Sequence, residues 1–194
     1  MTNGTRLDRD GCFVREGALD RVSTPFAPVV AALGARIRER FGPGRLHSSY
    51  LFGSTPLSGP DLAAELPRYR PTSLLARETN GDLIHSLPGL REKAAAATTE
   101  AERIRLTRGV ARRLVRTGLT LVMPRWGGWT SDLAESAEVF GRYYPAYAEQ
   151  MCAAARAART PATYPELLDE LLNGLAPWLA AEYLAVHGAK APRP

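Results

Sequence analysis

The amino-acid sequence predicts a mainly α-helical fold with a small α+β remnant towards its N-terminus. Over residues 73–187, apolar residues recur at the three- and four-residue spacing of amphipathic helices. Before this region only residues 48–52 have the composition of a strand, and a glycine-serine pair follows them. We therefore expect a helical bundle that follows a fragment of a sheet.

Length and composition limit the classes of protein that this chain can belong to. Its 194 residues suffice for one domain, or for a small lobe joined to a helical lobe. The sequence has no apolar run near the ~18–20 residues of a membrane span, and its first ten residues are polar. Cys12 and Cys152 are isolated, and the three histidines lack metal-ligand spacing. We expect a cytoplasmic protein with reduced thiols, no membrane partner and no Cys or His metal site.

The first predicted helix follows Thr24, a capping residue, and Pro25, which suits the first helical position. Its helically spaced apolar residues, which predict a buried side, are Val29, Val30, Leu33, Ile37 and Phe41. Gly42 and the two residues after it end the helix. The next element is the strand at 48–52.

A loop and a series of helices follow the strand. Residues 55–71 contain four prolines and read as a loop. The expected helices span residues 73–87, 99–122, 130–143, 145–158, 165–173 and 175–187. These elements predict a partial lobe at 1–54, a linker at 55–72 and a helical lobe at 73–188. No second strand is visible, so the predicted strand has no partner for its backbone groups and part of a sheet is missing.

The order of these elements resembles a known family. A helix, then a strand ending in YLFGS at 50–54, resembles the start of the nucleotidyltransferase fold of the DNA polymerase β-like superfamily, and the aminoglycoside-nucleotidyltransferase-like proteins most of all. The segments RRLVRTG at 112–118, MPRWGGWTSDL at 123–133 and FGRYYP at 140–145 are similar to the helical C-terminal lobe of that group. The resemblance covers residues 10 to 187.

The resemblance implies an activity: transfer of a nucleotidyl group from ATP to a small hydroxylated acceptor such as an aminoglycoside, with Mg²⁺. Gly53 would let backbone amides approach the triphosphate, and the Ser54 hydroxyl would add a hydrogen bond. In such enzymes the next strand carries an Asp-x-Asp pair that holds Mg²⁺. Here the nearest carboxylates after Ser54 are Asp61 and Glu65, four residues apart in a proline-flanked stretch.

The missing carboxylate pair predicts an impaired enzyme without a metal site of its own. We expect that the chain passes from the first strand directly into the inter-lobe linker. Mg²⁺ and ATP are then expected as cofactors only if activity persists. In that case the partners are a nucleotide and a small-molecule acceptor, and Gly53 and Ser54 are the nucleotide-binding candidates.

Four residues are candidates for the acceptor pocket. The resemblance places the turn at 126–132 near the acceptor, where Trp129 could stack, Asp132 could attract a cationic amine and Thr130 lies between them. As a structural alternative, Thr130 or Ser131 caps the following helix and Asp132 complements its dipole. Arg113 flanks an apolar helix face, where it either pairs with a carboxylate or points into the inter-lobe cleft.

Two other functions remain open. A non-catalytic helical module for protein interaction would use an apolar patch or the unpaired strand edge, which favours a homodimer. An RNA-binding helical domain would use one side of the helix at 99–122, with Arg105, Arg108, Arg112 and Arg116. The net charge of +5 comes almost wholly from arginine. A GC-rich coding sequence explains this usage better, and the arginine side of the helix then reads as a solvated face. We therefore do not expect nucleic acid as a partner.

Overall fold

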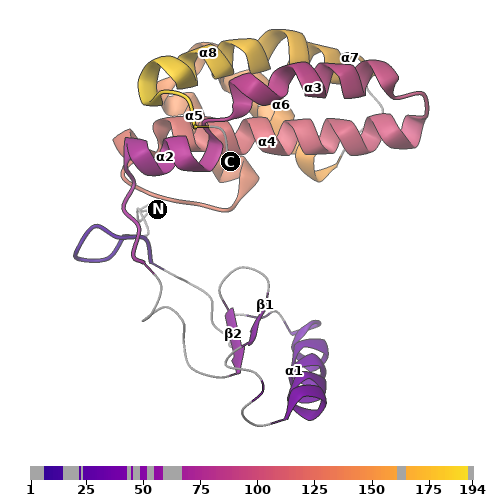
Figure 1. Cartoon of the computed structure of the whole chain (residues 1–194), viewed down its shortest axis with the longest axis vertical. Coiled ribbons are helices and arrows are strands. Elements are labelled where there is room, and N and C mark those ends of the chain that lie inside the picture. The colour runs from indigo at the N-terminus through magenta and orange to yellow at the C-terminus, as the bar shows by residue number, and fades with distance from the viewer. Residues whose placement is uncertain are drawn as a thin grey trace. The chain divides into compact units, whose positions relative to one another are not determined.

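The computed structural model describes residues 7–14, 22, 24–42, 45, 49–51, 55–58, 67–160 and 165–191. The chain forms two compact units, one of Phe13–Tyr69 and one that joins Met1–Cys12 to Arg70–Pro194. The fold is mainly α-helical, as predicted (Figure 1). None of the described helices has both the length and the apolarity needed to span a membrane.

The smaller unit contains one helix and a β-hairpin. Helix α1 spans Ala27–Phe41, β1 spans Ser49–Leu51 and β2 spans Thr55–Ser58. The strands pair antiparallel, with Leu51 opposite Thr55. The strand predicted at 48–52 is therefore present, whereas the prediction that it lacks a partner is wrong. The partner was missed because β2 is short and contains a proline, which a strand tolerates only at an edge.

The apolar side of α1 is largely exposed to solvent. Val29 is 66% exposed, and Leu33 and Phe41 are 45% and 46% exposed. Gly34 is the buried residue of this helix. The prediction of a buried face is thus wrong, because a two-stranded hairpin provides too little apolar surface to cover a helix.

The larger unit is a helical bundle. Its elements are α2 (Ser73–Asn80), α3 (Leu83–Ala96), α4 (Glu100–Trp126), α5 (Leu133–Tyr143), η3 (Pro145–Tyr147), α6 (Ala148–Arg159), α7 (Pro165–Glu170), η4 (Leu171–Leu175) and α8 (Ala176–His187). Helix α4 is the longest and packs against each of the other α-helices of this unit, most extensively against α5 and α6 (Figure 1).

Local sequence explains where α4 begins and ends. The Thr99 hydroxyl accepts the N–H of Glu102, and the Glu102 carboxylate accepts the N–H of Thr99, which forms a capping box. Gly127 ends the helix in the left-handed conformation, with φ of 69°. Between these caps, Leu114 and Leu121 are fully buried. These residues make α4 the centre of the core.

Two prolines act differently from expectation. Pro88 was expected to end a helix, but α3 continues through it, and the chain breaks instead at Gly81. A Cβ atom at Gly81 would lie 3.0 Å from the backbone nitrogen of Lys190, so this close approach requires glycine. The expected helices at 165–173 and 175–187 are not separated, because α7, η4 and α8 follow one another directly; η4 is π-helical, and Pro177 lies in the first turn of α8.

Candidate functional site

A groove separates α6 from the segment formed by α7 and η4, and we call it the α6–α7 groove. Its volume is about 640 Å³, within the range of ~300–1,000 Å³ that is typical of small-molecule sites. A second cavity of about 390 Å³ extends it along η4 and shares Ala153, Arg156, Leu167 and Glu170 with the first. The two cavities form one elongated site.

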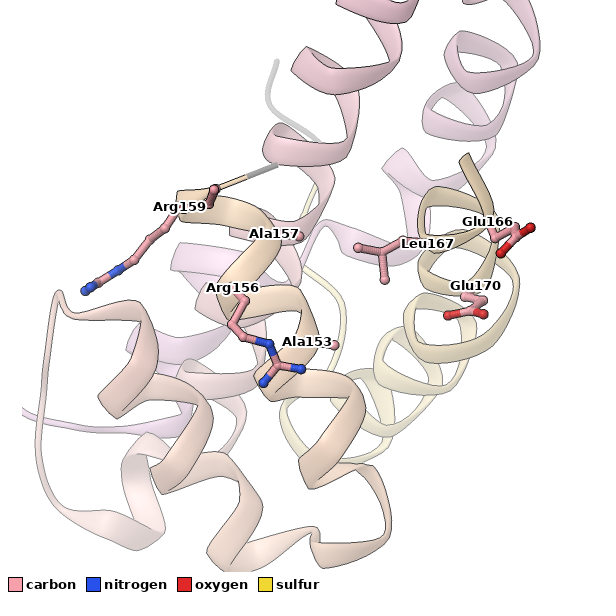
Figure 2. Close-up of a pocket in the computed structure, with 8 residues that line it drawn as sticks. Ala153, Arg156, Ala157, Arg159, Glu166, Leu167 and Glu170 are labelled. Atoms are coloured by element: carbon pink, nitrogen blue, oxygen red, sulfur yellow. The ribbon is translucent and has the colours of Figure 1, made fainter. Parts of the chain in front are cut away.

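The floor of the α6–α7 groove is apolar. Ala153 and Ala157 lie four residues apart on α6, and Leu167 projects towards them from α7 (Figure 2). Because alanine has no side-chain atoms beyond Cβ, this pair leaves space between the helices. On the η4 side, Leu171 and Leu175 extend the apolar lining. Since π-helical segments are frequent at functional sites, the position of η4 beside the groove favours a binding role.

The rim of the groove carries unequal charge. Glu166 and Glu170 are exposed carboxylates of α7, and Arg156 lies across the groove on α6 (Figure 2). Glu149, a third exposed carboxylate, is on α6 and lines the second cavity. Within the described residues, none of these four side chains makes an ion pair or a hydrogen bond. Three carboxylates therefore outnumber one guanidinium, so the groove is locally acidic in a chain whose net charge is +5.

A second arginine at the groove is already engaged. Arg159 lines the cavity, but its side chain points away from it, and its guanidinium binds the carboxylate of Asp132 (Figure 2). The N–H of Glu135, the guanidinium of Arg159 and the N–H of Ala134 together lower the pKa of Asp132, and Glu135 has the largest effect. Arg159 is thus paired with Asp132 and does not neutralise the groove carboxylates.

Three of the predicted acceptor residues meet at the N-terminus of α5. Asp132 is the N-cap and accepts the N–H groups of Ala134 and Glu135 at 2.8 and 3.0 Å. Thr130 is buried; its hydroxyl donates to the Glu135 carboxylate and accepts the N–H of Asp132. Trp129 is half-buried just before them. The expectation that Thr130 or Ser131 caps this helix is wrong, because two N–H groups point at the Asp132 carboxylate.

Arg113 lies elsewhere. Its guanidinium is 3.0 Å from the carboxylate of Asp82, in the turn before α3. Arg113 lies near the middle of α4, and the helix continues from it to Trp126, roughly 20 Å further along the helix axis. The structure therefore pairs Arg113 with a carboxylate and does not bring it to the turn that contains Asp132.

The predicted nucleotide contacts, Gly53 and Ser54, lie outside the described residues. The strand after them, β2, has the sequence Thr-Pro-Leu-Ser and so carries no carboxylate. Among the residues that the structure describes, no three His, Cys, Asp or Glu side chains come together in a way that could hold a metal ion. These residues do not fit a Mg²⁺ site of the Asp-x-Asp kind.

Comparisons with protein-family models, with curated proteins and with solved structures found no match for this chain. The resemblance to nucleotidyltransferases therefore stays a prediction, and function has to be argued from the residues themselves.

The sequence analysis did not identify the groove. Glu149, Arg156, Glu166 and Glu170 have the pattern of ordinary solvated helix faces. Two features of the sequence could have pointed to the groove. Ala153 and Ala157 are small residues on one face of α6, and Glu166 and Glu170 are four residues apart on α7. Neither signal shows that α6 and α7 lie beside each other, since that depends on tertiary packing.

Proposed function

We propose that this chain is a nucleotidyltransferase-like protein whose helical unit binds a small, cationic, hydroxylated molecule in the α6–α7 groove without transferring a nucleotide to it. The excess of carboxylates around an apolar groove supports this proposal above all. Glu149, Glu166 and Glu170 have no ionic partner within the described residues, and Arg156 alone opposes them.

The chemistry of the groove favours an amino sugar or a similar ligand. Ammonium groups interact favourably with the three rim carboxylates, since opposite charges attract across a partly dry groove. The apolar floor of Ala153, Ala157 and Leu167 suits the C–H face of a sugar ring. The amide of Gln150, which also lines the groove, provides donors and an acceptor for hydroxyl groups. An aminoglycoside combines these features, and the family resemblance implies the same ligand class.

The proposal includes the loss of nucleotidyl transfer. A positioned metal ion contributes several kcal/mol to the stabilisation of such a transition state. No carboxylate lies on β2 to hold the ion, so we expect no transfer from ATP to an acceptor in the presence of Mg²⁺. If nucleotide does bind, Gly53 and Ser54 would contact its phosphates.

Calorimetric titration with kanamycin at low ionic strength tests the binding site. The double variant Glu166→Gln/Glu170→Gln should bind at least about tenfold more weakly, which is 1.4 kcal/mol. Arg156→Gln should bind more tightly, because it removes the one opposing charge. Glu92→Gln, at an exposed position of α3, is the matched control and should bind as the unchanged chain does. Equal affinities in all four proteins would reject the groove as the site.

A separate assay tests transfer. The chain is incubated with kanamycin, Mg²⁺ and ATP labelled in its α-phosphate, and the sugar is examined for label. We expect none. Labelled product would reject the non-catalytic part of the proposal, whatever the titration shows. A thermal melt with and without Mg-ATP shows whether nucleotide binds, since a ligand at ~100 times its dissociation constant adds roughly 2.7 kcal/mol.

One observation favours a second function, self-association through the smaller unit. Exposed large apolar residues lie on and next to α1: Phe26, Val29, Leu33 and Phe41. Exposed apolar patches of this kind mark interaction sites. We propose that a second copy covers this face. Light scattering should give the mass of a dimer for the unchanged chain and of a monomer for Val29→Glu/Leu33→Glu. A monomer in both cases would contradict this function.

A further inference from the structure

Helix α4 carries a row of exposed arginines that the proposed function does not use. The row consists of Arg105, Arg108, Arg112 and Arg116, and we call it the α4 arginine row. Spacings of three and four residues place these side chains on one face of the helix. The opposite face contains the buried residues Leu114 and Leu121. The row extends from Arg105 to Arg116, which is roughly 16 Å along the helix axis.

The four guanidinium groups have no ion-pair partner within the described residues. Other arginines of the bundle do, since Arg113 pairs with Asp82 and Arg159 pairs with Asp132. Glu102 is the nearest acidic residue of α4, but its carboxylate accepts the N–H groups of Thr98 and Thr99. Those hydrogen bonds are the main reason why the pKa of Glu102 is lowered, and the charge of Arg105 adds a smaller effect.

The positive surface continues beyond α4. Lys93 of α3 and Arg105 line the same cavity, of about 450 Å³, and Glu102, whose carboxylate already accepts the N–H groups of Thr98 and Thr99, lines it as well. A fifth cationic side chain is therefore near the N-terminal end of the row. Since clustered like charges repel one another in the absence of an anion, this arrangement gains stability when a polyanion binds.

Composition alone did not favour nucleic acid as a partner, but four exposed arginines on one face without ion-pair partners among the described residues do. We propose that the α4 arginine row binds the phosphate backbone of a nucleic acid strand, independently of base sequence. Guanidinium groups form strong, often bidentate hydrogen bonds with phosphate. One strand of a duplex carries a charge about every 3.4 Å of axis, so a row of roughly 16 Å can contact four phosphates.

Fluorescence anisotropy with a short labelled single-stranded RNA and a duplex DNA tests this surface. Four phosphate contacts predict a slope of log K against log salt of about −2.8 for the single strand and about −3.6 for the duplex. Affinity for the RNA should therefore fall about 50-fold between ~50 and ~200 mM KCl. Failure of both probes to bind at ~50 mM salt would overturn the proposal.

The decisive variant replaces all four arginines of the row by glutamine, which has a similar helix propensity. The matched control makes the same change in net charge at four other exposed positions: Arg36, Arg38, Arg40 and Arg142. We expect the row variant to lose most of its affinity and nearly all of its salt slope, and the control to keep both. A control that loses as much as the row variant would overturn the proposal, because net charge alone would then explain binding.

Two further variants keep the test decisive if the fourfold glutamine variant does not fold. Replacement of the four arginines by lysine retains the charges, and the slope should stay near that of the unchanged chain. Arg112→Gln alone should reduce the single-strand slope by about 0.7. The groove variant Glu166→Gln/Glu170→Gln should leave RNA binding intact, so the two proposals can fail independently. An unchanged slope in Arg112→Gln would count against the row.

Discussion

The hydroxyl of Tyr183 in α8 donates a hydrogen bond to the carbonyl oxygen of Ala76 in α2, at a distance of 2.5 Å. The same hydroxyl lies 3.1 Å from that of Thr120 in α4, which in turn accepts the side-chain N–H of Asn80 at 3.0 Å. Tyr183, Ala76 and Thr120 are all buried. This network joins three helices at one point, and burial raises the pKa of the tyrosine, so its hydroxyl keeps its proton.

Removal of the Tyr183 hydroxyl should destabilise the bundle. Tyr183→Phe removes the buried hydrogen bonds of this hydroxyl with the Ala76 carbonyl and the Thr120 hydroxyl, and the loss of a hydrogen bond costs about 0.5–1.5 kcal/mol. Urea denaturation followed by circular dichroism measures the loss. Tyr147→Phe is the matched control, because Tyr147 is half-buried and stacks on Trp178 with ring centroids 3.6 Å apart, a contact that phenylalanine keeps. Equal stabilities of the two variants would contradict the role of the network.

The sequence predicted the helical bundle well because its signals are local. Apolar spacing predicted a helix at 99–122, which α4 confirms, although the helix continues through Pro124 to Trp126. Prolines were less informative. Pro88 removes one backbone hydrogen bond, but Leu83 and Leu87 of the same helix are buried, and their packing outweighs that loss.

The site was predicted less well, since it depends on which helices are neighbours. Thr130 and Asp132 were placed at one turn by sequence proximity, and they do lie together. The pairing of Asp132 with Arg159 spans 27 residues and required the packing of α5 on α6. Neither helix propensity nor charge spacing indicates such a contact. The exposed side of α1 shows the same limit, because amphipathicity predicts a buried face without identifying what covers it.

The cap of α5 predicts an order of stabilities. Asp132→Ala removes an acceptor for two N–H groups and should cost about 0.5–2 kcal/mol. Asp132→Asn keeps an acceptor and loses only the charge beside Arg159. Both side chains of that pair are about half exposed, so this loss should be within ~1 kcal/mol. Asp169→Ala, at an exposed position of α7, is the control for urea denaturation. A larger loss for the asparagine variant than for the alanine variant would contradict this account.

The lowered pKa of Asp132 also predicts an effect of acid. Its carboxylate stabilises the fold fully above the unfolded-state pKa of about 3.9, and this contribution is lost as pH falls through the lower pKa of the folded state. Stability should therefore fall less steeply below about pH 4 in Asp132→Asn than in the unchanged chain. Urea midpoints measured from neutral pH down to acid pH give the comparison. Parallel curves in this window would reject the assignment.

His187 predicts a second dependence on pH. Its Nε2 hydrogen-bonds the carbonyl of Leu121 at 2.9 Å, its Nδ1 is buried and has no partner among the described residues, and burial lowers its pKa. The charge of Arg125 acts in the same direction. The unfolded chain therefore takes up a proton below about pH 6.5 while the folded chain resists it. The free energy of unfolding should therefore decrease as pH falls below about 6.5, and it should stop decreasing once pH lies below the lowered pKa of His187 in the folded state.

A glutamine at position 187 provides the test, because its amide donates to Leu121 but does not titrate near neutral pH. The fall in stability below about pH 6.5 should be smaller in His187→Gln. His85→Gln is the control: His85 is exposed, and the variant should keep the pH dependence of the unchanged chain. If both variants gave the same curve, the buried imidazole would not be the group responsible.

Two glycines of α4 should respond to substitution with opposite signs. A Cβ atom at Gly118 would lie 2.5 Å from Cε of Met151 and 3.1 Å from Cδ2 of Phe140, whereas one at Gly109 meets nothing within 4 Å. Gly109→Ala should raise stability by about 0.8–1 kcal/mol, because alanine is the better helix former.

Gly118→Val should lower stability by about 1–3 kcal/mol, because its methyl groups overpack the buried contact of α4 with α5 and α6. Gly109→Val is the control, because it changes helix propensity in the same way without creating a close contact. Urea denaturation of all four chains separates the two effects. If valine cost the same at both positions, close packing at Gly118 would not be what requires glycine there. A loss of stability only at position 118 would mean that the close packing of α5 and α6 on α4 requires glycine there. Because α6 forms one wall of the groove, that wall would then depend on Gly118.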